Sequence, residues 1–249
     1  MKDFLQALSF LTILPAGQPP FPKEKGLARS MAFFPLVGLL IGLLLAIAYF
    51  LLSFLFSTSL VLWFALGCLV LLTRGFHLDG FADTIDGFAA GGPKEKILEV
   101  MKDSRIGAFG VVGLILLIGA KYLALEQLVG ASIPRSLIFM TVMGRNSMVW
   151  VCYRSPYARS GGGLAKPFAE NLTTREMIIS SASAFGIGLL LWGLDGIAVF
   201  LGIGLFSLAF RLFFLKKLNG VTGDILGAAN ELSELLCLIL LIIFKAGTV

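Results

Sequence analysis

Three aspartates with helical spacing stand out in this sequence. Asp79, Asp83 and Asp86 occur at positions i, i+4 and i+7, so on a helix their carboxylates share one face. Like charges at this spacing repel each other, and a cation held against the stripe would relieve that repulsion. Large apolar residues separate the three acids, which disfavours the alternative that they only cap or solvate a helix end. Because carboxylate oxygens suit a hard divalent ion, the stripe predicts a site for Mg²⁺.

A second acidic set occurs near the C-terminus, where Asp224 and Glu231 share one helical face and Asn230 and Glu234 share the adjoining one. Carboxylates inside an apolar stretch are costly and usually functional. Two acidic helices that converge on one cation would relieve the repulsion within both. The predicted metal ligands are therefore Asp79, Asp83, Asp86, Asp224 and Glu231.

Four cations are candidates for binding substrate phosphates, namely Lys102, Arg105, Arg145 and Lys166. Arg145 lies within an apolar run and needs an anionic partner, either one of the acids or a phosphate. The triple glycine at 161–163 lets backbone N–H groups approach an oxyanion closely. A flexible loop and ordinary membrane-flanking charges remain the alternative interpretations of these features.

Two residues are candidates for the catalytic base, Asp103 and His77, and a carboxylate of the acidic stripe is a third possibility. His77 is the only histidine and would titrate near neutral pH, although a lone histidine is as often a structural hydrogen-bonding group. The chain has no cysteine or serine nucleophile with a paired base. Carboxylates for a divalent ion together with cations for phosphates indicate phosphoryl-group transfer.

The elements that carry these residues are predicted to lie in a membrane. The 249 residues are 57% hydrophobic and only 14% charged, with a mean hydropathy of +0.93, whereas soluble proteins have roughly 25% charged residues. We expect one all-α domain over 1–249, a polytopic bundle of about seven transmembrane helices. The N-terminal segment 1–30 is expected at the membrane interface, and the loop 73–106 carries the acidic motif. The predicted spans are 31–53, 55–72, 107–126, 134–153, 177–194, 196–214 and 226–245.

The distribution of lysine and arginine predicts how this bundle is oriented. If the N-terminus is cytoplasmic, sixteen of the 20 cations lie on that side, three (Lys121, Arg135 and Lys245) lie outside, and Arg145 falls inside a span. The acidic loops then face the cytoplasm from a multi-pass protein of the cell, or inner, membrane. The net charge of +5 is scattered rather than gathered in a basic run, so we expect no nucleic-acid partner.

The motifs resemble those of the cobalamin synthase family, also called adenosylcobinamide-GDP ribazoletransferases. The resemblance is carried by the runs His77-Leu78-Asp79-Gly80-Phe81-Ala82-Asp83-Thr84-Ile85-Asp86-Gly87 and Met101-Lys102-Asp103-Ser104-Arg105-Ile106-Gly107-Ala108-Phe109-Gly110. The segments 161–165 and 223–231 look like the family's later motifs, and the motif order agrees over essentially the whole chain.

This resemblance implies the last assembly step of cobalamin biosynthesis. The family joins adenosylcobinamide-GDP to α-ribazole or its 5′-phosphate and releases GMP, with Mg²⁺ as the usual metal, at the cytoplasmic membrane. Oligomeric state is left open. Two alternatives are a phospholipid-forming CDP-alcohol phosphotransferase, from whose pattern this sequence departs after the first Asp-Gly pair, and a cation-coupled transporter, which would place its acids near the midplane.

Overall fold

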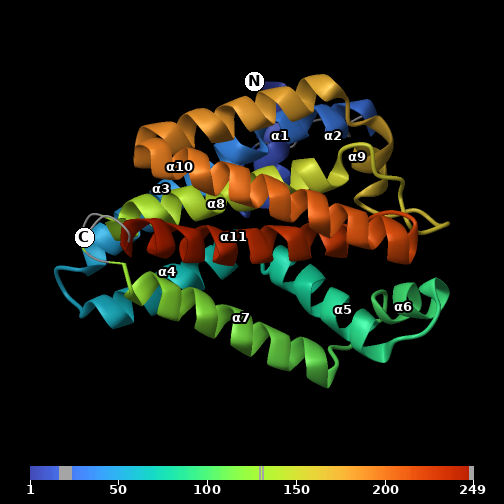
Figure 1. The fold of residues 1–249 in the computed structure, drawn as a ribbon, viewed down its shortest axis with the longest axis horizontal. Helices are drawn as coiled ribbons and strands as arrows, with labels where there is room; N and C mark the ends of the chain where they lie inside the picture. Colours follow the sequence, from blue (N-terminus) through green and yellow to red (C-terminus); the bar gives the residue numbers. More distant parts are fainter. Residues whose placement is uncertain (17–23, 129, 131, 247–249) are drawn as a thin grey trace.

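The chain forms an all-α bundle, as expected from its sequence (Figure 1). The computed structural model describes residues 1–16, 24–128, 130 and 132–246, so part of the predicted N-terminal segment lies outside the described residues. The α-helices are α1 Lys2–Leu11, α2 Glu24–Ser30, α3 Phe34–Leu52, α4 Thr58–Leu72, α5 Phe76–Ala90, α6 Lys94–Val100, α7 Ala108–Glu126, α8 Ser132–Cys152, α9 Lys166–Asn171, α10 Thr174–Leu218 and α11 Gly223–Ala246, with a 3₁₀ turn at Met31–Phe33.

Within the described residues, four helices are long and apolar enough to cross a membrane, and a bent pair makes a possible fifth. The four lie in Gly26–Leu52, Ala108–Glu126, Thr174–Leu218 and Gly223–Phe244. The pair consists of α4 and α5, which meet at 88°. The apolar helices fit a membrane protein, and the full set of seven spans stays a prediction.

α8 forms the centre of the bundle. Nearly all of its side chains are buried by other helices, so polar residues are tolerated along it. Because of these polar residues, α8 is not among the helices that are apolar enough to cross a membrane. α3 packs closely on it because Gly38 and Gly42 bring the two backbones together, and Thr141 donates a hydrogen bond to the Gly38 carbonyl oxygen at 2.8 Å. Small residues at this spacing allow two helices to pack closely.

α10 is a helix that turns back on itself. Gly193 has a non-helical conformation with φ +57°, and the backbones of Gly188 and Gly196, on either side of it, lie against each other. Figure 1 shows the two arms of α10 lying one above the other at the top of the bundle. The expected spans 177–194 and 196–214 correspond to these two arms.

The break between α4 and α5 sets the geometry of the acidic motif. Arg74 and Gly75 both adopt left-handed backbone conformations, with φ of +56° and +64°. The chain turns sharply there, so that α5 starts at Phe76 and runs at 88° to α4 (Figure 1). This start point allows α5 to pack along α7 and α11.

Candidate active site

The three aspartates of the first motif lie on α5, as their spacing predicts. Asp79 is exposed, whereas Asp83 and Asp86 are half-buried. The opposite side of the helix carries Phe81, which packs with Leu117 of α7 and Ala228 of α11. Burial of this apolar side therefore orients the carboxylates away from the core.

Asp224 is brought to the same place by close packing of α5 on the start of α11. A β-carbon at Gly80 would lie 2.8 Å from the Asp224 Cα, and one at Gly227 would lie 3.1 Å from the His77 carbonyl oxygen. A side chain at Gly80 would therefore force the two backbones apart, and one at Gly227 would require a smaller shift, so these glycines allow the close approach of the acidic helices. The charges of Asp79, Asp86 and Asp224 all repel a charge on Asp83.

Arg159 is the cation that lies against this acidic cluster. Its Nη2 donates to Asp224 Oδ2 at 2.6 Å and to the Met101 carbonyl oxygen at 3.2 Å. The loop that carries it is paired with the segment before α11, since the Ala158 N–H donates to the Val221 carbonyl oxygen at 2.9 Å. This pairing holds Arg159 beside Asp224.

Asp86 has a clear structural role. Its two carboxylate oxygens accept the backbone N–H groups of Gly107 at 2.7 Å and Gly110 at 2.8 Å, at the N-terminus of α7. A carboxylate at this position satisfies N–H groups that have no partner within the helix. Side chains at Gly107 or Gly110 would collide with this carboxylate. As placed here, Asp86 caps α7, and its predicted role as a metal ligand is untested.

Asp103 forms an exposed ion pair with Arg105. Arg105 Nε and Nη2 donate to the Asp103 carboxylate at 3.0 and 2.7 Å. These side-chain hydrogen bonds, with one from the Arg105 backbone, lower the pKa of Asp103 to about 2. A carboxylate with so low a pKa is a weak base at neutral pH. The pair also occupies the Arg105 guanidinium that was predicted to bind phosphate.

The two predicted phosphate-binding lysines lie near the molecular surface. Lys102 is exposed just after α6, and Lys166 at the start of α9 lies 3.8 Å from Glu170 in an i, i+4 pair. Both are accessible to a ligand, and their predicted role is untested.

Glu231 and Arg145 belong to a buried ion network rather than to the acidic cluster. Lys121 of α7 donates to Glu231 and to Glu234 at 2.6 Å each, and Arg145 of α8 pairs with Glu234. Asn230 donates to both glutamates. Two positive and two negative charges balance, which offsets the cost of burying them. Glu231 and Arg145 would have to leave these partners to act as metal ligand or phosphate-binding residue.

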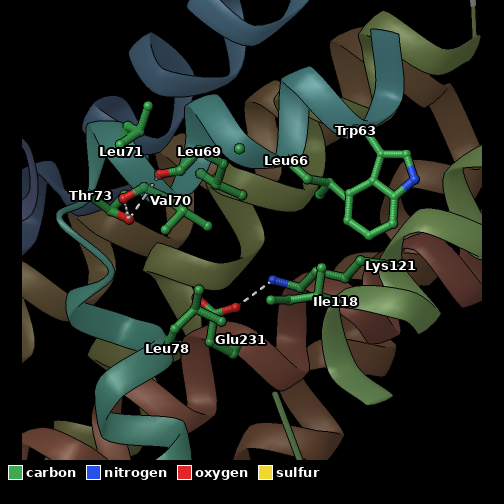
Figure 2. A pocket seen from close by; sticks show the side chains of 11 residues that line it. Trp63, Leu66, Leu69, Val70, Leu71, Thr73, Leu78, Ile118, Lys121 and Glu231 are labelled. Carbon is green, nitrogen blue, oxygen red and sulfur yellow. Dashed lines mark hydrogen bonds and ion pairs between the residues drawn. The ribbon is translucent and has the colours of Figure 1, made fainter. Parts of the chain in front are cut away.

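The network borders an apolar cavity of about 360 Å³ between α4, α5 and α7 (Figure 2). Trp63, Leu66, Val70 and Ile118 are among its lining residues, with the Lys121–Glu231 pair at one side (Figure 2).

His77, one of the two residues predicted as the catalytic base, is buried in the core. Its side chain is 1% exposed, and neither ring nitrogen has a hydrogen-bond partner in the described part of the chain. It lies near the positive charges of Arg145 and Lys121.

The acidic cluster fits a divalent cation in its chemistry and its charge. All its donors are carboxylate oxygens, and Arg159 neutralises only part of its charge. Among the residues that the structure describes, no three acidic, histidine or cysteine side chains are gathered tightly enough to hold a metal ion as they stand. Binding would therefore require side chains to rotate toward one another.

Lys121 and Arg159 contact the candidate site residues, although the sequence did not predict either of them as part of the site. Lys121 was counted as a charge flanking the outer face, but it is buried between Glu231 and Glu234. A lysine within one apolar run and two glutamates within another could have indicated the pair. Arg159 gave no comparable signal, because only the loop pairing at Val221 brings it to Asp224.

Comparisons with known proteins show the family to which this chain belongs. The family model described as cobalamin-5-phosphate synthase matches residues 3–242. An adenosylcobinamide-GDP ribazoletransferase of Syntrophobacter fumaroxidans is 41% identical, covering 95% of this chain and 96% of its own. One of Geotalea daltonii is 40% identical, covering 97% of each chain. No solved structure matches. This chain belongs to the cobalamin-5-phosphate synthase family of transferases.

Proposed function

We propose that this chain is an adenosylcobinamide-GDP ribazoletransferase that completes cobalamin assembly. Its donor is adenosylcobinamide-GDP, and its acceptor is α-ribazole or α-ribazole 5′-phosphate. The names of its relatives and their near-complete coverage support this assignment. The observation that carries it is the meeting of the α5 aspartates with Asp224 beside Arg159, because acids and a cation at one point suit the transfer of a phosphoryl group.

The reaction exchanges one phosphorus–oxygen bond for another. A ribazole hydroxyl oxygen bonds to the phosphorus attached to cobinamide, while the bond from that phosphorus to the bridging oxygen breaks. GMP leaves with the bridging oxygen, and the hydroxyl proton passes to a base. Lys102 and Lys166 are accessible for the phosphates, whereas Arg105 and Arg145 would first exchange their carboxylate partners.

Mg²⁺ is the proposed cofactor, and Asp79, Asp83 and Asp224 are the strongest candidates for its ligands. Glu231 and Asp86 are weaker candidates because hydrogen bonds already occupy both of their carboxylate oxygens, whereas the hydrogen bonds of Asp224 within the described residues all go to Oδ2. A bound divalent ion would supply charge neutralisation for the leaving GMP.

A carboxylate oxygen of α5 that the metal leaves free is the best candidate for the base. Asp103 remains ionised but is weakly basic, because Arg105 holds its pKa near 2. His77 is enclosed by the core and is 1% exposed. Asp79 lies at a cavity of about 640 Å³ that also contains Arg74, so a hydroxyl group bound there would reach it.

The site is proposed to face the cytoplasm from the cell membrane. Sixteen cations would lie on that side, and the three outer ones fall to two once Lys121 is removed from the count. The excess of lysine and arginine on the cytoplasmic side therefore becomes larger.

Purified protein mixed with adenosylcobinamide-GDP, α-ribazole phosphate and Mg²⁺ tests this function. We expect GMP and a cobalamin phosphate in equal amounts, and no CMP from CDP-diacylglycerol. Turnover should stop when a chelator removes the metal. Release of CMP without GMP would establish the phospholipid alternative instead.

A further inference from the structure

A cavity of about 500 Å³ lies between α6 and the loop that follows α8. Its size is within the range of small-molecule pockets. Three cations line it, Lys94, Lys102 and Arg159, together with the backbone of Gly161 and Gly162. Lys94 and Lys102 flank α6, whereas Arg159 comes from the loop after α8, so the fold brings Arg159 to the two lysines.

The glycines of this loop are not explained by packing. A β-carbon at Gly161 or Gly162 would meet no atom within 4 Å, and neither residue requires a left-handed conformation. Gly163 differs, since a side chain there would collide with the Tyr157 hydroxyl. Open space beside two glycines leaves room for a ligand to approach the backbone N–H groups closely, as phosphate oxygens do in glycine-rich loops.

Arg159 connects this cavity to the acidic cluster. It lines the cavity and also donates to Asp224 at 2.6 Å. Its Nε is buried and has no hydrogen-bond partner among the described residues, so the guanidinium has donor capacity to spare. A pyrophosphate that extends from the cavity to the acidic cluster would therefore contact the Arg159 guanidinium.

We propose that this cavity binds the guanosine diphosphate part of the donor, with Arg159 binding the pyrophosphate. The proposal rests on the function proposed above. Lys94, Lys102 and the 161–162 backbone hold the nucleotide end of the diphosphate, and Arg159 places the reacting phosphorus next to Asp79, Asp83 and Asp224.

Two carboxylates in the cavity give it a preference for guanine. Glu95 and Glu99 lie one helical turn apart on α6 and line the same space. Guanine presents N–H donors at N1 and N2, which a carboxylate accepts, whereas adenine has an acceptor at N1. The cavity should therefore bind GMP more tightly than AMP.

Equilibrium binding of GMP and AMP to the purified protein in detergent tests the proposal without turnover. We expect Arg159→Ala and Gly161→Ala each to weaken GMP binding about tenfold, the loss of one charge-assisted contact or of close backbone approach. The matched controls are Lys96→Ala, on α6 but outside the cavity, and Gly119→Ala, where a side chain also meets open space. Both controls should bind GMP like the wild type.

The double change Glu95→Gln with Glu99→Gln distinguishes base recognition from simple charge effects. We expect weaker GMP binding and unchanged or tighter AMP binding. Equal tightening for both nucleotides would show that the carboxylates only repel phosphate and would overturn the guanine preference.

Unchanged GMP affinity in both Arg159→Ala and Gly161→Ala would overturn the cavity assignment, even if the protein releases GMP in the transfer assay. Displacement of GMP by phosphatidylglycerol vesicles but not by GDP would assign the cations to lipid headgroups and also overturn it. Tight GMP binding in a protein that forms no cobalamin phosphate would instead refute the proposed function and leave the cavity assignment standing.

Discussion

The aspartates of α5 have different tasks although they share one face of one helix. Asp79 is exposed, Asp83 is half-buried among like charges, and Asp86 is tied to the N-terminus of α7. Their spacing predicted the shared face correctly. It could not predict the cap, because the N–H groups of Gly107 and Gly110 belong to another helix that only the tertiary fold brings near.

The cap makes Asp86 a stability residue. Asp86→Ala removes two hydrogen bonds and a charge at a helix N-terminus, which should lower the free energy of unfolding by about 0.5–2 kcal/mol. Thermal unfolding in one detergent measures the effect. Asp79→Ala is the matched control and should unfold at the wild-type temperature while losing transfer. If both variants unfold alike, Asp86 does not cap α7 as described.

The ion pair of Asp103 predicts how the enzyme responds to pH. Arg105 lowers the pKa of Asp103 to about 2, so the stabilising pair is complete above the usual carboxyl pKa and is lost only as pH falls toward 2. Asp103 therefore changes charge well below neutral pH. Turnover of Asp103→Asn between about pH 5 and pH 9 should follow the wild-type profile in shape. Loss of an acid limb in this variant would identify Asp103 as the base after all.

Individual helices were predictable from apolar runs, but their partners were not. The hairpin within α10 falls close to the expected loop near 195, because Gly193 interrupts an otherwise continuous apolar segment. The polar helix α8 was expected as a span, and it proves to be the enclosed centre of the bundle. Which charges meet across α7, α8 and α11 depends on helix rotation, which a sequence without relatives does not specify.

The buried network should be essential for the packing of these helices. Lys121→Met leaves Glu231 and Glu234 with one cation between them and should destabilise the protein by about 3–5 kcal/mol. The yield of monodisperse protein and its unfolding midpoint report the loss. Adding Glu231→Gln should recover part of it, and Lys216→Met at the exposed end of α10 is the control. Full stability of Lys121→Met would mean that the network contributes little.

In the whole molecule, the C-terminal end of α5, α6 and the loop after α8 lie at one end of the bundle, and the α10 turn lies at the other (Figure 1). Charge counting predicts that the end with the site faces the cytoplasm. Reporter fusions near residues 90, 165 and 220 should give a cytoplasmic signal, and those near 55, 130 and 195 should give an external one. A cytoplasmic signal at 195 would contradict this orientation and the predicted spans.

The α5 acids and Asp224 are proposed to form one cation-dependent site, and a magnesium titration of Asp83→Asn is the measurement that bears on this site. Asp83 is affected by the negative charges of Asp79, Asp86 and Asp224. Asparagine keeps the shape of the side chain but removes the charge that would hold the ion.

If these acids hold the ion, Asp83→Asn should lower turnover at least about tenfold, equivalent to about 1.4 kcal/mol in barrier, with weaker dependence on Mg²⁺ and unchanged folding. Asp195→Asn, at the α10 turn, should match the wild type. Wild-type turnover by Asp83→Asn at unchanged Mg²⁺ affinity would show that Asp83 is not a ligand of a cation at this site.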